Sequence, residues 1–242
     1  MRAYAFSQRC AREILRDPLN LLFGLGFPVI LLLLLSAIQA NVPVALFEIR
    51  HLTPGITVFG LSFLTLFSAT LVAKDRESAF LQRLYTTPMK PADYILGYLL
   101  PLIPIAVVQS AVCYLVAMVL GLPVSIHILY ALLAIVPICV FYISLGLLFG
   151  SVLTTKQVGG ICGALLTNLS AWLSGVWFDL ELVGEVFRKI ANVLPFVHAV
   201  ELERAMLLGE FSQALPHVFP VALYAAAVTS AAILLFLRQM KR

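Results

Sequence analysis

The charged residues of this chain leave five long stretches with no Asp, Glu, Lys or Arg at all. These stretches are 18–47, 51–73, 94–155, 157–178 and 211–237. One charged residue at the centre of a bilayer costs roughly 2.5–3.5 kcal/mol, whereas a helix of about 20 apolar residues can cross it. Long uncharged runs bounded by charged islands therefore predict membrane-spanning helices.

The stretch 94–155 is too long for one crossing, because at 1.5 Å per residue it would make a helix of roughly 93 Å, about three times the hydrocarbon thickness. Gly121-Leu122-Pro123 marks the turn that divides it. We predict an all-α membrane protein with six transmembrane helices, at about 19–40, 52–73, 95–119, 128–150, 158–177 and 216–237. Hydrophobic residues make up 62% of the chain and charged residues 12%, which is unlike a soluble domain, so we expect 1–242 to form one transmembrane domain.

The basic residues predict the orientation, because cytoplasmic flanks are enriched in Lys and Arg. Six crossings place both termini on one side, and most basic residues lie on that side. Only four fall opposite: Arg50, Arg188, Lys189 and Arg204. We therefore expect both termini in the cytoplasm and the chain in the cell (inner or plasma) membrane. Contact with anionic lipid headgroups accounts for the net charge of +4, and nucleic acid is not needed as a partner.

Three segments outside the predicted spans are amphipathic. Residues 1–17 form an Arg-rich face against an apolar face, which predicts an interfacial helix with either an anchoring or a mechanical role. Residues 75–87 place Phe80, Leu81, Leu84 and Tyr85 on one arc, which fits either a helix at headgroup level or one that inserts into a groove of a partner protein. Residues 179–208 predict two short helices that dip into the outer leaflet.

The second and fifth predicted spans each carry a stripe of similar residues along one face. Small residues recur every fourth position at Gly159, Gly163, Thr167, Ala171 and Gly175, which favours close helix packing, either within the chain or between subunits. Phe59, Phe63 and Phe67 recur at helical spacing, as either packing or pathway residues.

Several kinds of chemistry have no residues to support them. The six predicted spans hold no ionisable residue of the kind that ion-driven carriers use. The four histidines, His51, His127, His198 and His217, have no ligand spacing, so we expect interfacial side chains rather than a metal site. The four cysteines, Cys10, Cys113, Cys139 and Cys162, are expected to be apolar fillers. A GxxxxGK[ST] phosphate-binding loop is missing, so the chain is not expected to be an enzyme that hydrolyses ATP.

Two motifs stand after the second and fifth predicted spans. The first is a stretch like Glu-Arg-Glu-x-Gly-Thr-Leu-Glu-x-Leu after the second span, read here as 75–84, with Thr86-Thr87-Pro88 and Gly97 downstream. This sequence departs from it at Ala79, Phe80 and Gln82. The second is Gly175-Val176-Trp177-Phe178, then Leu194-Pro195, then Ala199-Val200-Glu201-Leu202-Glu203-Arg204, with Asp179 where Pro is common. Together with the six predicted spans, these motifs resemble those of a known family, the type 2 permease subunits of ATP-binding cassette (ABC) exporters. The resemblance covers nearly the whole chain.

The resemblance implies that 75–87 is a coupling helix seated in a cytoplasmic ATPase subunit. Its contact residues would be Asp75, Arg76, Glu77, Phe80, Leu81, Leu84 and Tyr85. Two ATPases, which bind ATP and Mg²⁺, would then work with two permease subunits as a homodimer or heterodimer. The second and fifth spans, with both stripes, would line the dimer interface and pathway, and 179–208 would form re-entrant helices that cap it.

The expected function is export, and the uncharged span surfaces favour a hydrophobic or amphipathic compound such as a drug, antibiotic or lipid. Two alternatives remain. One is an ATP-independent channel or secondary carrier, and the other is a membrane assembly subunit that transports nothing itself.

Overall fold

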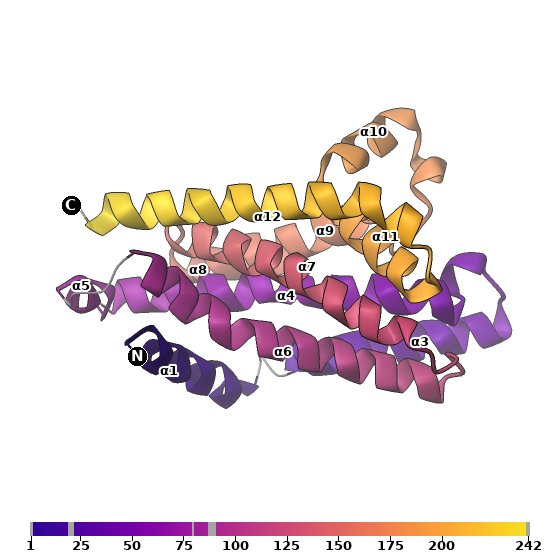
Figure 1. Ribbon diagram of the computed structural model, residues 1–242, viewed down its shortest axis with the longest axis horizontal. Helices are drawn as coiled ribbons and strands as arrows, with labels where there is room; N and C mark the ends of the chain where they lie inside the picture. The colour runs from indigo at the N-terminus through magenta and orange to yellow at the C-terminus, as the bar shows by residue number, and fades with distance from the viewer. Residues whose placement is uncertain (1, 19–21, 79, 87–90, 241–242) are drawn as a thin grey trace.

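The computed structural model describes residues 2–18, 22–78, 80–86 and 91–240, and all regular secondary structure in these ranges is helical. Within these ranges, five helical segments are long and apolar enough to cross a bilayer: Leu22–Asn41, Ile49–Glu77, Asp93–Val119, His127–Gly150 and Phe211–Gln239. They run along the long axis of the molecule (Figure 1). The all-α prediction is confirmed, and these segments match five of the six predicted spans.

The first half of the chain gives α1 (Arg2–Arg16), the π-helical turn η1 (Leu22–Gly26), α3 (Phe27–Asn41), the 3₁₀ turn η2 (Ala45–Phe47), α4 (Ile49–Glu77), α5 (Phe80–Tyr85) and α6 (Pro91–Val119). The second half gives α7 (His127–Gly150), α8 (Thr155–Val158), the π-helical η3 (Gly159–Leu166), α9 (Thr167–Leu173), the 3₁₀ turn η4 (Leu180–Val183), α10 (Glu185–Val193), α11 (Pro195–Leu208) and α12 (Phe211–Met240). Asp17-Pro18 follows α1, as expected for residues that end a helix.

The fifth predicted span, 158–177, differs from the prediction. The structure has three consecutive helical segments, α8, η3 and α9, which together cover only 155–173. They begin at a capping box, in which the Thr154 N–H donates to the Gln157 side chain at 3.0 Å. They end before Gly175, whose φ of +70° is left-handed and interrupts the helix.

Helix α4 forms the centre of the bundle, because nearly every residue from Leu52 to Ala73 is buried. It packs against α3, α6, α7, α9 and α11. Gly146 and Gly150 of α7 bring that helix onto the α4 backbone, where a Cβ atom would collide with Thr65 and Ala69. Ser68 Oγ donates to the Ile143 carbonyl at 3.0 Å across this contact. Small residues thus join α4 and α7 closely.

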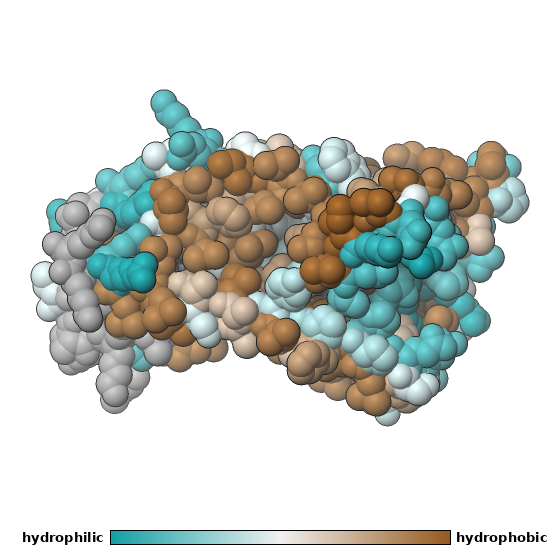
Figure 2. Space-filling model, turned by 90° about the horizontal axis from the view of Figure 1, so that it is seen from above, coloured by the Kyte–Doolittle hydropathy of each residue, from teal (hydrophilic) through white to brown (hydrophobic). Residues whose placement is uncertain are grey.

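The surface of the bundle is apolar along the middle of its length. Figure 2 shows hydrophobic side chains over the central part of one face, with hydrophilic side chains gathered towards both ends. Large apolar side chains of α3, α7 and α12 are exposed, among them Leu34, Leu133 and Leu234. An exposed apolar surface of this extent matches the hydrocarbon layer of a membrane.

The predicted outer segment 179–208 contains η4, α10 and α11. Pro195 is the first residue of α11, a position that suits its missing N–H and fixed φ. Helix α10 projects from the bundle, whereas α11 packs against α4, α7 and α12 (Figure 1). The two predicted amphipathic pieces therefore have different surroundings, and most residues of α11 are buried in the protein.

Candidate functional site

The candidate site lies at the end of the molecule that holds α1, α5 and the C-terminal end of α12 (Figure 1). It is built from four elements: α1, the last turn of α4, α5 and the first turns of α6. Helix α1 packs along α6, and α5 follows α4 after one turn. We call these four elements the α1–α6 unit.

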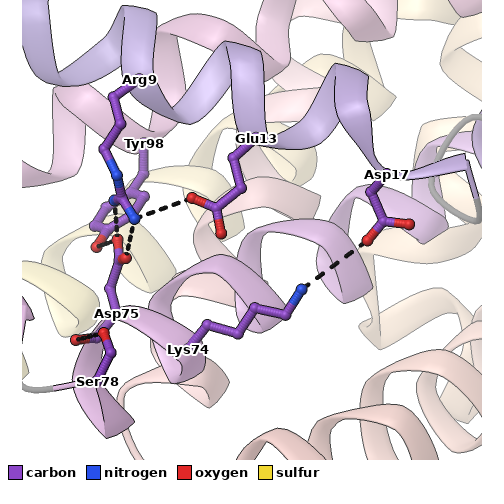
Figure 3. Close-up of polar contacts among 7 residues, drawn as sticks. All are labelled: Arg9, Glu13, Asp17, Lys74, Asp75, Ser78 and Tyr98. Carbon is purple, nitrogen blue, oxygen red and sulfur yellow. Dashed lines mark hydrogen bonds and ion pairs between the residues drawn. The ribbon is translucent and has the colours of Figure 1, made fainter.

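A buried ion pair forms the centre of the α1–α6 unit. Asp75 of α4 is 1% exposed and accepts two hydrogen bonds from the Arg9 guanidinium, at 2.6 and 2.5 Å. Tyr98 of α6 donates to the same carboxylate at 2.8 Å, and Glu13 lies 3.0 Å from Arg9 (Figure 3). The hydrogen bonds to Asp75 raise the pKa of Arg9 above its usual value. Arg9 therefore stays charged and holds three helices together.

Aromatic rings surround this ion pair. The Arg9 guanidinium lies 4.1 Å from the ring centroid of Phe80, the first residue of α5. Phe6 stacks with Phe80 at 6.3 Å and meets the Tyr98 ring edge to face at 4.8 Å. Gly97 makes room for Phe6, because a Cβ atom there would overlap the ring. Helix α1 thus contacts both α5 and α6 through Phe6 and Arg9.

The two residues after Asp75 bind the segment between α7 and α8. Arg76 donates to the carbonyls of Ser151 and Leu153 at 2.6 and 2.5 Å. Glu77 accepts from the Thr155 N–H and hydroxyl at 2.8 and 2.7 Å. The last turn of α4 therefore holds the segment between α7 and α8 in place at this end of the bundle.

The predicted helix 75–87 is divided in the structure. Residues 75–77 are the end of α4, Ser78 is a turn, and α5 covers only 80–85. We predicted Asp75, Arg76 and Glu77 as contacts for a partner, but all three bind groups of their own chain. Leu81 is buried and Phe80 is half-buried against α1. Leu84 and Tyr85, which we also predicted as contacts for a partner, have side chains outside the part of the chain that the structure describes.

The Phe59, Phe63 and Phe67 stripe is buried within the chain. Phe59 and Phe63 pack at 5.6 Å, and Phe27 of α3 meets both rings. Trp177 adds a further ring at 5.5 Å from Phe59. In this single chain the stripe therefore joins α4 to α3.

The small-residue stripe of the fifth predicted span is divided between two surroundings. Thr167 and Ala171 are buried, and Gly163 faces the Leu66 side chain of α4. Gly159 has open space around its Cα, and Gly175 is buried outside any helix. The exposed face of η3 and α9 carries Gly160, Ala164, Asn168 and Trp172 instead.

Sequence reasoning missed one buried acid, Glu203 of α11. It is 0% exposed, and one carboxyl oxygen accepts from the Tyr114 hydroxyl of α6 at 2.7 Å. The other oxygen has no hydrogen-bond partner among the described residues. Burial raises the pKa of Glu203 well above its ordinary value. No sequence signal marks it, since it lies in a charged segment that resembles surface.

No group of three or more His, Cys, Asp or Glu side chains that could hold a metal occurs in the part of the chain that the structure describes. The polar side chains of Arg9, Glu13, Asp75 and Tyr98 in the α1–α6 unit bind one another. The arrangement suits the transmission of movement between helices better than covalent chemistry.

Comparison with known proteins supports the resemblance. Residues 2–208 match the family described as ABC-2 type transporter. The chain is also 26% identical over 230 residues to nodulation protein J of Bradyrhizobium diazoefficiens, an alignment that covers 94% of this chain and 86% of that protein. The chain therefore belongs to the ABC-2 type transporter family, as a multi-pass membrane permease subunit that does not itself hydrolyse ATP.

Proposed function

We propose that this chain forms the substrate pathway of an exporter and is driven by a cytoplasmic ABC ATPase that docks at α5. ABC-2 permeases pair with ABC ATPase subunits. In this proposal two ATPases, which bind ATP and Mg²⁺, work with two permease subunits, as a homodimer or a heterodimer. ATP-driven closure of the ATPases moves α5, and the permease pair then changes which side of the membrane its pathway faces.

The single observation that carries this proposal is the Arg9–Asp75 pair, which joins α1, α4 and α6 beside α5. A bidentate pair with one fully buried partner resists separation. Because Phe80 of α5 packs on Phe6 and Arg9, a force on α5 would reach α4 and α6 as a movement of the whole unit. Helix α4 is the most buried helix of the bundle, so its tilt would shift its neighbours.

The proposed topology has six crossings, with 155–173 as the fifth and both termini in the cytoplasm. The N-terminal end of α1 and the C-terminal end of α12 lie at the same end of the molecule as α5 (Figure 1). An even number of crossings would require this arrangement. Helix α10 and the adjoining η4 would then lie at the outer leaflet. Exposed apolar residues support this position: Leu182, Val186, Ile190 and Val193.

We further propose that the second permease packs on the exposed face of η3 and α9. Leu165 and Trp172 are 59% and 50% exposed there, and Gly159 and Gly160 allow a close approach. A pathway beside this face would be uncharged, because α8 to α9 carries only Lys156 near its cytoplasmic end. Such a lining favours a hydrophobic or amphipathic cargo.

The test is reconstitution of the permease with its ATPase in liposomes, with ATP hydrolysis and cargo flux measured together. Phe80→Asp should insert normally and leave ATP hydrolysis running while flux is lost, because the charge breaks the packing of α5 on α1. Phe80→Leu keeps an apolar side chain and should retain flux. Flux of the wild-type permease without any ATPase would instead favour a channel or carrier, and no flux with ATPase would favour an assembly subunit.

A further inference from the structure

Two histidines that are distant in the sequence meet at the end of the bundle opposite α5. His198 of α11 and His217 of α12 lie with their Nδ1 atoms 2.9 Å apart. The Nε2 atom of His198 is 2.9 Å from the Asn192 carbonyl oxygen of α10. We expected the histidines to be interfacial side chains rather than a metal site, and the structure brings these two together.

The hydrogen bonds fix the tautomers of the pair. His198 must carry its proton on Nε2, because a carbonyl oxygen only accepts. Its Nδ1 atom then holds a lone pair, so the Nδ1 atom of neutral His217 must be the donor. One proton therefore lies between the two Nδ1 atoms. If His217 carried its proton on Nε2 instead, both Nδ1 atoms would have a free lone pair.

We propose that His198 and His217 form a two-histidine site for a divalent transition-metal cation. A metal-binding histidine typically donates its other N–H to a backbone carbonyl, and His198 already does so to Asn192. When the metal enters, the proton on Nδ1 of His217 leaves that position, and His217 takes the Nε2–H tautomer. Both Nδ1 atoms then offer a lone pair, and small rotations of the two rings direct these lone pairs at one cation.

The two nitrogens, which a hydrogen bond holds together in the metal-free chain, are close enough to bind one cation at adjacent positions. With metal–nitrogen bonds of roughly 2.0–2.1 Å, nitrogens 2.9 Å apart subtend about 90° at the metal. That angle fits adjacent positions of tetragonal Cu²⁺ or Ni²⁺, whereas tetrahedral Zn²⁺ needs a separation of about 3.3 Å. Cu²⁺ also binds nitrogen ligands most tightly of the first-row divalent ions, so it is the cation that fits this site best.

The surroundings leave room for water as the remaining ligands. Both rings are partly exposed, and no third His, Cys, Asp or Glu joins them among the residues that the structure describes. Glu201 is one turn from His198 and is already paired with Arg204 at 2.7 Å, so it contributes negative charge nearby rather than a bond. A bound cation would tie α11 to α12 beside the Tyr224–Val193 hydrogen bond that joins α12 to α10.

The test is a Cu²⁺ titration of the full chain in nanodiscs of phosphatidylcholine, followed by electron paramagnetic resonance. The wild type should bind Cu²⁺ with hyperfine coupling to two nitrogens. His217→Ala leaves the His198–Asn192 hydrogen bond in place and should weaken binding on the order of 100-fold, since one of two linked ligands is lost. His127→Ala is the matched control, because His127 is also half-buried at the start of a long helix.

Size-exclusion chromatography and thermal unfolding of each variant establish that it is folded. His198→Ala should give the same loss as His217→Ala, and if it fails to fold, His217→Ala alone decides. Equal Cu²⁺ affinity in the wild type, His217→Ala and His127→Ala would overturn the proposal. A wild-type spectrum without coupling to two nitrogens would overturn it as well.

Discussion

Breaking the Arg9–Asp75 pair gives the most informative stability measurement on this chain. The Asp75 side chain is 2% exposed and that of Arg9 is 37% exposed, so removal of Arg9 leaves a buried charge without its partner. Removing one partner of a buried pair costs about 3–5 kcal/mol. Because solvent screens the half-exposed Arg9, we expect Arg9→Met to cost about 3 kcal/mol, at the lower end of this range.

Asp75→Asn removes the charge but keeps a side chain of the same shape. The Asn amide nitrogen cannot accept, so one of the two hydrogen bonds from Arg9 is lost, and a bond to a charged group is worth about 1.5–3 kcal/mol. The remaining oxygen can still accept from Tyr98, so we expect a loss of about 2 kcal/mol. In the double variant, Asp75→Asn removes the buried charge that Arg9→Met alone would leave without a partner. The two effects should then fall short of additivity by about 2 kcal/mol, within the range seen for contacting residues.

The assay is the free energy of unfolding of the purified permease in detergent micelles, for the wild type, both single variants and the double variant. Lys74→Met serves as the control, because Lys74 and Asp17 are 4.0 Å apart and more exposed. Its loss should cost at most about 1 kcal/mol. Additive effects of Arg9→Met and Asp75→Asn would refute the inference that this pair holds the α1–α6 unit together.

Two further predictions concern packing and pH. Gly97→Ala should destabilise the chain by about 1–3 kcal/mol, because its Cβ would overlap the Phe6 ring, whereas Gly160→Ala, with open space around it, should be neutral or stabilise by up to about 1 kcal/mol. Equal effects in unfolding measurements would contradict the packing of α1 on α6. Burial raises the pKa of Glu203 above 4.5, so the folded state binds more protons than the unfolded state, and stability should fall as pH rises from 4.5 towards the folded pKa. Glu203→Gln should flatten this decline in thermal unfolding curves, and an unchanged slope would show that Glu203 does not cause it.

Most spans could be predicted from the sequence because charge is excluded from the hydrocarbon layer. The clearest difference among them is α4, which we expected at 52–73 and which extends to Glu77. Asp75, Arg76 and Glu77 looked like the start of a separate helix because they are charged. They continue α4 because each is paired with groups of its own chain. These partners are distant in the sequence, so the periodicity of the segment cannot predict them.

The fifth predicted span was harder to define because glycine leaves several helical geometries open. Gly159-Gly160 begins a π-helical turn and Gly175 has a positive φ, so the helical path is shorter than its hydropathy indicated. The stripe at 159–175 was read at one spacing over its whole length, and the wider π-helical turns move part of it to a different face.

The residues of the candidate site could be found by their pattern, but their partners could not. The amphipathic segments 1–17 and 75–87 were both recognised, yet nothing in either pattern says that Arg9 meets Asp75, 66 residues away. An amphipathic face does not identify the surface that it covers. The same limit applies to His198 and His217, which lie on different helices and meet only through the packing of α11 on α12.

Crosslinking tests most directly whether α5 faces the cytosol and receives the force of the ATPase. The four native cysteines are buried, and burial raises the pKa of Cys10 to about 12, so a single new cysteine can be labelled selectively. Arg83→Cys places a photo-crosslinker on the exposed side of α5, and Val124→Cys places one at the opposite end of the bundle.

The measurement is the crosslinked product formed in membranes that contain the permease and its ATPase. We expect a permease–ATPase adduct from position 83, which should be labelled only from the cytosolic side, and no adduct from position 124. An adduct from position 124 alone, or labelling of position 83 from outside the cell, would contradict it.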